Sequence, residues 1–332
     1  MFLTFVVLVL GVFVIRNINT QRTDRLSEIE DSSLKATAYM AGLNREEFDK
    51  SNLENTGIVK IDDGAVQGYN FKPKNQKSND VFITLGGSEG EIDYLHSSFL
   101  SENGYNTYAF YYFGAKNQNP ELVDVELRDF EAMLSYIKKE NKEVGNITLI
   151  GTSKGAEMAL LLAHYYPETV DKLVLYSPTS YIWQGLSKDY QNVKSSWTYD
   201  GEELEFLDFD SAGILPVLKM MFKGIVNSPM EFRSFYDGAM RSSGASKFSI
   251  STNNIRSKTL IFAGGDDRMW DSAAMGNHIQ SSIADAQIHI YEDAGHVFFG
   301  PTVYNNVSVG GTYQENVCAL MDSNEKLLEF IK

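Results

Sequence analysis

Short apolar runs recur along the chain, separated by segments in which apolar residues return every third or fourth position. The separating segments predict helices, for example at Glu121–Lys139 and Lys154–Tyr165. The runs predict strands at Val81–Leu85, Thr107–Phe113, Ile147–Gly151, Lys172–Tyr176, Thr259–Gly264 and Gln287–Tyr291. Strands that alternate with helices predict an α/β fold, in which helices flank both faces of a mostly parallel central sheet.

Two parts of the chain depart from this alternation of strands and helices. Gly57–Ile61 and Ala65–Phe71 are predicted to form two strands joined by a turn at Asp62-Asp63-Gly64. Residues 178–256, about 80 in number, then separate two predicted strands and are too many for a loop, so we expect a helical cap insertion there. Aromatic and methionine side chains of this insertion, such as Trp183, Trp197 and Phe222, could roof an apolar pocket or form the core of the cap itself.

The N-terminus carries a different pattern. Phe2 to Ile15 is a nearly continuous apolar run that ends at Arg16. At 1.5 Å per residue the run spans about 21 Å, which is less than the roughly 30 Å of a bilayer core. No basic segment precedes the run and no Ala-x-Ala site follows it, so residues 1–16 are expected to be an uncleaved membrane anchor, with a signal segment as the alternative. Residues 17–56 are expected to be a polar helical linker, and the side of the membrane that the domain occupies stays open.

Composition narrows the choice of partners. The 332 residues include 29 Lys and Arg against 44 Asp and Glu, and the net charge of -15 argues against nucleic-acid binding. The hydrophobic fraction of 43% is that of a folded globular protein. Cys318 is the single cysteine, which excludes an intrachain disulfide and a cysteine zinc cluster. We expect it to be a buried thiol that packs as a small hydrophobic residue.

Two segments match the pattern Gly-x-Ser-x-Gly, which can form a sharp strand-to-helix turn that exposes a nucleophilic serine. They are Gly151–Gly155 and Gly86–Gly90, and each follows an apolar run. Ser153 is followed by helix formers and lies on a middle strand of the series, where partners from later strands can reach it. Ser88 lies after the first parallel strand, so Ser153 is the predicted nucleophile.

A serine nucleophile needs a base, and four of the five histidines lie within predicted helices or strands. His296 instead lies in the loop after the last predicted strand, where an imidazole can reach over the edge of the sheet, and it is the predicted base. The loop Gly264–Asp271 follows the preceding strand and supplies the acid that orients this imidazole. Asp267 is the predicted acid and Asp266 the alternative; either one gives the order serine, acid, histidine.

An oxyanion hole completes the predicted site. The backbone N–H of Lys154 is one donor, and the other comes from the loop at Gly87, Ser88 and Glu89. The second Gly-x-Ser-x-Gly match then supplies backbone amides and no nucleophile. The side chain of Lys154 could meet an anionic substrate or pair with Glu157, one turn along the helix.

Taken together, these segments resemble a known family. Gly-Thr-Ser-Lys-Gly-Ala-Glu around Ser153, the loop Gly86–Gly90, Gly-Gly-Asp-Asp-Arg-Met-Trp around Asp267 and Ala-Gly-His296 are similar to the C-terminal catalytic domain of the acyl-CoA thioester hydrolase and bile-acid-CoA:amino-acid N-acyltransferase family. The resemblance implies an α/β-hydrolase fold over residues 57–332, with Ser153, Asp267 and His296 as the catalytic residues. Members that transfer acyl groups to amino acids carry cysteine at the nucleophile position, so Ser153 favours hydrolysis. Only roughly 65 residues separate the expected anchor from the first parallel strand, too few for the N-terminal β-sandwich of the animal members.

The expected function is therefore that of a serine hydrolase, which cleaves acyl thioesters or carboxylic esters through an acyl-enzyme. This chemistry needs neither a metal nor an organic cofactor, and the expected partners are a small acyl substrate and the membrane. One alternative is a serine peptidase of the same fold. Another is a catalytically inactive, membrane-tethered binding module, against which the three intact catalytic positions argue.

Overall fold

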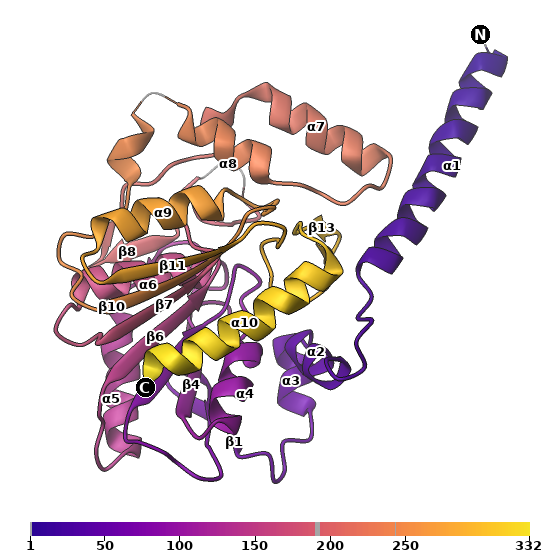
Figure 1. Ribbon diagram of the computed structural model, residues 1–332. Coiled ribbons are helices and arrows are strands. Elements are labelled where there is room, and N and C mark those ends of the chain that lie inside the picture. Colours follow the sequence, from indigo (N-terminus) through magenta and orange to yellow (C-terminus); the bar gives the residue numbers. More distant parts are fainter. Residues whose placement is uncertain (1, 190–192, 243) are drawn as a thin grey trace.

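An eight-stranded sheet forms the centre of the molecule in the computed structural model, which describes residues 2–189, 193–242 and 244–332 (Figure 1). The strand order is β1-β2-β4-β3-β6-β7-β10-β11. The strands are β1 (Ile58–Asp63), β2 (Val66–Phe71), β3 (Val81–Leu85), β4 (Asn106–Tyr111), β6 (Ile147–Thr152), β7 (Lys172–Tyr176), β10 (Lys258–Gly264) and β11 (Ala286–Tyr291). Neighbours from β4 to β11 are parallel, whereas the hairpin β1–β2 adds antiparallel strands at one edge. The predicted mostly parallel sheet is confirmed.

Helices cover both faces of this sheet. Helices α5 (Asp129–Glu140), α6 (Lys154–Tyr165) and α9 (Ser272–Ser282) share one core with the strand residues Leu149, Leu173 and Ile261. Helices α4 (Tyr94–Glu102) and α10 (Tyr313–Ile331) share another with the next residues along, Ile150, Val174 and Phe262. Successive side chains of a strand point to opposite faces, so two apolar layers require the continuous apolar runs seen in the sequence.

One predicted helix begins later than expected. The helix expected at 121–139 begins at Asp129, and residues 125–126 form the short strand β5 (Val125–Glu126). This strand pairs in parallel with β8 (Trp197–Tyr199), and Leu122 forms a bridge with Leu186. The helical prediction for residues 121–128 is wrong because their backbone pairs with a segment distant in sequence, which a local pattern does not reveal.

The insertion between β7 and β10 forms a cap beside α9 (Figure 1). It contains β8, β9 (Glu202–Glu203), α7 (Ile214–Ile225), α8 (Arg233–Met240) and two short 3-10 helices, η1 (Asp210–Ala212) and η2 (Ala245–Phe248). Trp183, Leu207 and Tyr236 of the cap pack with Trp270 of the main domain in a separate hydrophobic cluster. Of the two roles open to the cap aromatics, these side chains form the core of the cap.

The N-terminal part of the chain forms α1 (Phe2–Leu26), α2 (Lys35–Ala41) and α3 (Arg45–Lys50). Helix α1 continues beyond the apolar run that ends at Arg16, and its N-terminal part projects away from the body of the molecule (Figure 1). Within the part of the chain that is described, no helix combines the length and the apolar character needed to cross a membrane. The anchor expected at residues 1–16 is not supported by this finding.

The environment of Cys318 also differs from expectation. Cys318 lies on α10 and is exposed, so the prediction of a buried thiol is wrong. The buried face of this helix carries Ala319, Leu320, Leu327 and Ile331. The 3.6-residue helical period places Cys318 on the side of α10 opposite this face, and its apolar character alone did not reveal that.

Candidate active site

Ser153 lies on the tight turn between β6 and α6. Its backbone has φ 58° and ψ -119°, a conformation that is strained for a residue with a side chain. The turn requires glycine at position 155, because a Cβ there would collide with the backbone oxygens of Leu85 and Gly86. Helix α6 can therefore approach β3 closely, and Ser153 is held at the carboxyl end of a central parallel strand.

His296 and Asp267 reach Ser153 from the loops after β11 and β10. His296 Nε2 lies 2.9 Å from Ser153 Oγ, and His296 Nδ1 lies 2.8 Å from Asp267 Oδ2. The other carboxylate oxygen, Asp267 Oδ1, accepts the backbone N–H groups of Met269 and Trp270, at 2.8 and 3.2 Å. These bonds hold the Asp267 carboxylate in one orientation, so that its second oxygen stays on the imidazole.

The neighbouring carboxylate, Asp266, has different partners. Its Oδ2 accepts the N–H of Gly311 at 3.0 Å, and its Oδ1 pairs with the Arg268 guanidinium at 2.5 Å. Of the two candidates that the loop offered, the structure brings Asp267 and not Asp266 to His296.

Three further residues hold this group in place, and sequence patterns did not single them out for that role. Ser177 Oγ donates a hydrogen bond of 2.6 Å to the backbone oxygen of His296. The Trp270 indole meets the His296 ring edge to face, with centroids 4.7 Å apart, and its Nε1 donates to the backbone oxygen of Ser177 at 3.2 Å. Arg233 of α8 donates to the backbone oxygen of Asp267 at 2.8 Å, which connects the cap with the acid loop.

The loop Gly87, Ser88 and Glu89 follows β3 and lies beside Ser153, as expected for an oxyanion hole. The Tyr112 hydroxyl fixes it by donating to the backbone oxygens of Gly86 and Gly87, at 2.8 and 2.9 Å. Lys154 is the first residue of α6, so its N–H has no acceptor within the helix and can serve a substrate. The N–H of Gly87, however, donates to Glu89 Oε1 at 3.0 Å, and no pattern in the sequence predicts that a carboxylate occupies this donor.

A cavity of ≈ 490 Å³ opens at Ser153. The cap aromatics are not among the residues that line it, so the prediction that they could roof the pocket is wrong. Much of the lining comes instead from the segment after α1 and from the segment after His296. These two segments contribute Ser27, Ile29, Ala38, Ala41, Gly42, Phe298, Phe299, Tyr304 and Val307. Mostly apolar walls with some polar groups among them are typical of sites that bind small ligands with an apolar part.

A second aspartate–histidine pair, Asp93 and His96, lines the same cavity. The His96 Nδ1 and Asp93 Oδ2 atoms are 2.7 Å apart, and Thr152 Oγ1 donates to the same carboxylate oxygen at 3.0 Å. Burial acts to raise the pKa of Asp93, but the charge and hydrogen bonds of His96 outweigh it, so the pKa lies below its ordinary value. The pair contacts the residue before Ser153 and not Ser153 itself. Across the described ranges, no group of three or more His, Cys, Asp or Glu side chains could hold a metal ion.

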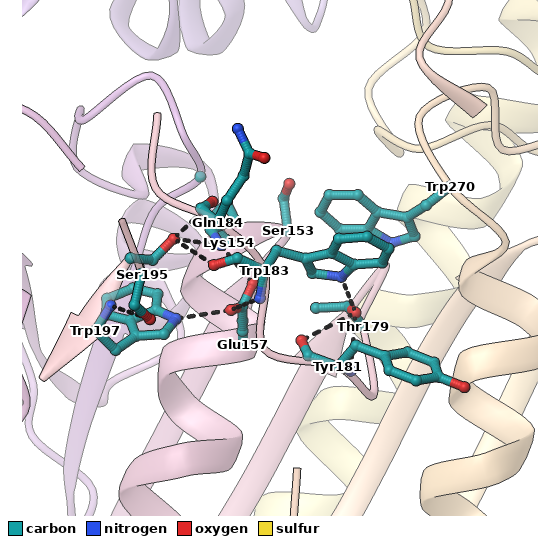
Figure 2. A network of polar contacts seen from close by, with 12 residues as sticks. Ser153, Lys154, Glu157, Thr179, Tyr181, Trp183, Gln184, Ser195, Trp197 and Trp270 are labelled. Atoms are coloured by element: carbon teal, nitrogen blue, oxygen red, sulfur yellow. Dashed lines mark hydrogen bonds and ion pairs between the residues drawn. The ribbon is translucent and has the colours of Figure 1, made fainter. Parts of the chain in front are cut away.

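The Lys154 side chain belongs to a buried network that reaches the cap (Figure 2). Its Nζ lies 2.6 Å from Glu157 Oε2 and donates to Ser196 Oγ at 2.8 Å. Glu157 Oε1 accepts the backbone N–H of Trp183 at 3.0 Å and the indole Nε1–H of Trp197 at 2.7 Å. Of the two roles left open for this lysine, the structure shows the pairing with Glu157. Burial lowers the pKa of Lys154, although the Glu157 carboxylate acts in the opposite direction.

Parallel strands covered by helices on both faces, with a strained serine turn after a central strand, define the class of the α/β-hydrolases. Within this class the chain belongs to the family described as BAAT / acyl-CoA thioester hydrolase C terminal, whose profile matches residues 125–331. The chain is thus an α/β-hydrolase by fold and a member of this family by sequence.

Relatives with similar sequences agree with this family. The chain is 31% identical to acyl-coenzyme A thioesterase 6 of Mus musculus over 118 residues, which are 35% of this chain and 28% of that protein. It is 29% identical to acyl-coenzyme A amino acid N-acyltransferase 1 of Mus musculus over 121 residues, 36% of this chain and 29% of that protein. The similarity to monoacylglycerol lipase ABHD6 of Homo sapiens is 28% identity over 193 residues, 52% of this chain and 55% of that protein. The matches therefore span less than a third of the two mouse proteins.

Among solved structures, an esterase of Pyrococcus furiosus superposes with a TM-score of 0.50 and 14% sequence identity. The superposition covers 85% of this chain and 93% of that chain. At this identity the similarity concerns the fold alone.

Proposed function

We propose that the protein hydrolyses acyl thioesters or carboxylic esters, with Ser153 as nucleophile, His296 as general base and Asp267 as the group that orients the base. The observation that carries the proposal is the chain of hydrogen bonds from Ser153 Oγ through His296 to Asp267, at the wall of the cavity. A serine hydroxyl is a weak nucleophile unless a neighbouring base removes its proton, and His296 Nε2 lies within reach of that proton.

The reaction proceeds in two halves. As Ser153 Oγ attacks the acyl carbonyl carbon, its proton passes to His296 Nε2, and Asp267 stabilises the imidazolium that forms. The negative charge on the former carbonyl oxygen is met by the N–H of Lys154 and by the loop Gly87–Glu89, after the Glu89 carboxyl leaves the Gly87 N–H. The proton on His296 then goes to the leaving thiolate or alkoxide, and the acyl group stays on Ser153. In the second half water attacks this ester while His296 takes a proton from the water. The bond between the acyl carbon and Ser153 Oγ then breaks, His296 returns the proton to Ser153 Oγ, and the carboxylic acid leaves.

The apolar lining of the cavity favours the acyl group as the part of the substrate that it holds. Phe298, Phe299 and Ile29 supply apolar walls that suit an aliphatic chain. Two of the mouse relatives carry acyl-coenzyme A in their names, which supports a thioester, whereas the human relative is named a monoacylglycerol lipase, which supports a carboxylic ester. Both substrates present the same carbonyl to Ser153.

Labelling with a fluorophosphonate tests the proposed nucleophile. The full-length protein is treated with the probe, and the adduct is located by mass spectrometry of its peptides. We expect the adduct on Ser153, no adduct in Ser153→Ala, and an adduct still on Ser153 in Ser88→Ala, because Ser88 contributes only backbone to the loop. An adduct on Ser88 would contradict the assignment of the two glycine turns.

A substrate panel tests the reaction. The rates for acyl-CoA thioesters, p-nitrophenyl acyl esters and peptide anilides are compared between the wild type and Ser153→Ala. We expect turnover of the thioesters, the acyl esters or both, reduced by roughly 10³-fold or more in the variant. Faster cleavage of the peptide anilides would favour a peptidase. A folded protein that neither turns over a substrate nor reacts with the probe would favour a binding module.

A further inference from the structure

Helix α7 of the cap presents its apolar side to solvent. Its exposed apolar residues are Ile214, Leu215, Val217, Leu218, Met221, Phe222 and Ile225. At 100° per residue they occupy one arc of roughly 160°. The exposed fractions reach 76% at Leu215 and 65% at Phe222, values that large apolar side chains rarely have together on one face.

The opposite side of α7 carries the two lysines of the helix, and both pair with a carboxylate. Lys223 Nζ lies 2.8 Å from Glu231 Oε2, and Lys219 Nζ lies 3.4 Å from Glu231 Oε1. Pro216, on the same side, is buried. A surface helix ordinarily turns its apolar stripe to the core and its charges to water. Helix α7 exposes its apolar stripe to water instead, and an exposed stripe of this size is typical of a surface that binds another apolar phase.

A second apolar surface adjoins the end of this helix. Two polar residues of α1 attach it to the C-terminal end of α7. Arg16 Nη1 donates a hydrogen bond to the backbone oxygen of Ile225 at 2.9 Å, and Asn19 Nδ2 donates one to the backbone oxygen of Val226 at 2.7 Å. One turn before Arg16, the side chain of Phe13 is 63% exposed, and the sequence between Phe2 and Phe13 is almost entirely apolar. Figure 1 shows α1 leaving the body of the molecule near α7.

We propose that the outer face of α7 and the N-terminal half of α1 together form a docking surface for a lipid bilayer. In this arrangement the 12-residue helix α7 lies flat in the interface, and the apolar run of α1 enters one leaflet. A run that spans about 21 Å is too short to cross the hydrocarbon core, but it is long enough to enter it. The exposed Arg22 and Arg25, on the next turns of α1, then lie at the depth of the lipid phosphates.

A bilayer fits these two elements better than a second copy of the chain. One helix lies along the surface and the other projects from it, and a fluid lipid phase accommodates both without a complementary shape. The net charge of -15 also makes two copies repel each other, whereas a bilayer of zwitterionic lipid carries no such charge.

The cavity at Ser153 shares chain segments with the docking surface, and its use as a route for substrate rests on the proposed function. Ser27 and Ile29, which follow α1, line the cavity. Met230, which follows α7, exchanges backbone hydrogen bonds of 2.9 and 2.7 Å with Asn306 and Ser308. These residues belong to the hairpin of β12 (Val303–Tyr304) and β13 (Val307–Ser308), which forms another wall. Two walls of the cavity are therefore built from segments that join the docking surface, an arrangement that would let an acyl lipid ester enter it from the lipid layer.

Co-sedimentation with vesicles tests the docking surface. The full-length protein is mixed with phosphatidylcholine vesicles, with and without phosphatidylglycerol. We expect binding to both, and Leu215→Ser/Phe222→Ser should weaken it at least tenfold, because two apolar side chains no longer leave water. The matched control is Val59→Ser/Met321→Ser, which removes two exposed apolar residues of β1 and α10 and should bind as the wild type does. Equal binding by the α7 variant and the wild type would overturn the proposal.

Two further measurements separate the remaining explanations. In Phe222→Trp, brominated phosphatidylcholine should quench the new tryptophan, and no quenching would contradict insertion of α7. Sedimentation velocity without lipid should show a monomer. A dimer that the α7 variant abolishes would show instead that a second copy of the chain covers the apolar stripe.

The docking surface and the active site should fail independently of each other. Ser153→Ala should bind vesicles normally, and the α7 variant should keep its hydrolysis of water-soluble esters and its probe labelling. Failure of the docking surface and failure of the proposed chemistry are thus distinguishable.

Discussion

At the scale of single residues, the two adjacent aspartates after β10 offer a matched comparison. Asp267 contacts His296 and two backbone N–H groups, whereas Asp266 contacts Gly311 and Arg268. Asp267→Asn keeps the size of the side chain but removes the charge that stabilises an imidazolium, so we expect kcat to fall by roughly 10³- to 10⁴-fold. Asp266→Asn should change kcat by only a few fold. Steady-state kinetics on one acyl ester measures both, and equal losses would contradict the proposed role of Asp267.

Glu89 is expected to make stability depend on pH. The surrounding cavity wall raises the pKa of its carboxyl above the ordinary value of 4.5 by desolvating the charged form, although part of the residue remains exposed to solvent. The folded protein then holds this proton more tightly than the unfolded chain. Glu89 therefore lowers stability as pH rises through the raised pKa, and the effect is absent below pH 4.5.

The variant Glu89→Gln keeps an acceptor for the Gly87 N–H and removes the charge. We expect its Tm to exceed that of the wild type at pH 7 to 8 and to equal it near pH 4, as measured by thermal unfolding across this range. Glu54→Gln, at an exposed position outside the cavity lining, is the control and should show no such trend. A Tm difference of the same size at every pH would show that the charge of Glu89 is not its cause.

At the scale of elements, the buried pair of Lys154 and Glu157 joins α6 to the cap. Glu157→Gln leaves the Lys154 ammonium buried without its counter-charge, and we expect a loss of roughly 3 to 5 kcal/mol in the free energy of unfolding. Glu46→Gln on α3 breaks an ion pair that is highly exposed, and it should cost less than about 1 kcal/mol. Urea unfolding of both variants measures the contrast.

Charge, and not shape, should account for that loss. The double variant Lys154→Met/Glu157→Gln removes both charges, so it should recover part of the stability lost in Glu157→Gln alone. If the double variant is less stable than the single one, packing against Trp197 and not the unpaired charge is the dominant effect.

At the scale of the whole molecule, the N-terminal segment has two parts: α1 projects from the body, and the residues after α1 line the cavity. Removing residues 1–26 leaves Ser27, Ile29 and Gly42 in place, so kcat/KM for short water-soluble esters should change by less than about threefold. Removing residues 1–43 takes these lining residues away and opens the cavity. We expect this variant to lose its preference for longer acyl chains, measured as kcat/KM for p-nitrophenyl esters of increasing length. An unchanged preference would show that the acyl chain lies elsewhere.

Much of the fold follows from local patterns alone. The strands β3, β4, β6, β7, β10 and β11 lie within two residues of the predicted runs, because a strand covered on both faces must be apolar throughout. The helix α6 has the predicted bounds, since the glycine turn sets its start. The family membership follows from the motifs around Ser153, Asp267 and His296, which the structure brings within hydrogen-bonding distance.

Other features depended on contacts between segments distant in sequence. Residues 125–126 form a strand because the cap supplies a partner strand, and Asp267 rather than Asp266 meets His296 because backbone N–H groups orient its carboxylate. The cavity wall at Ile29, the Glu89 carboxyl on the Gly87 N–H and the outward stripe of α7 likewise appear only in three dimensions. The sequence by itself determined the parallel sheet, the serine turn and the family, because these arise from periodicity and backbone sterics within a few residues. Only the tertiary structure decided which groups meet and which faces stay uncovered, because hydrogen bonds and burial depend on what the rest of the chain brings alongside.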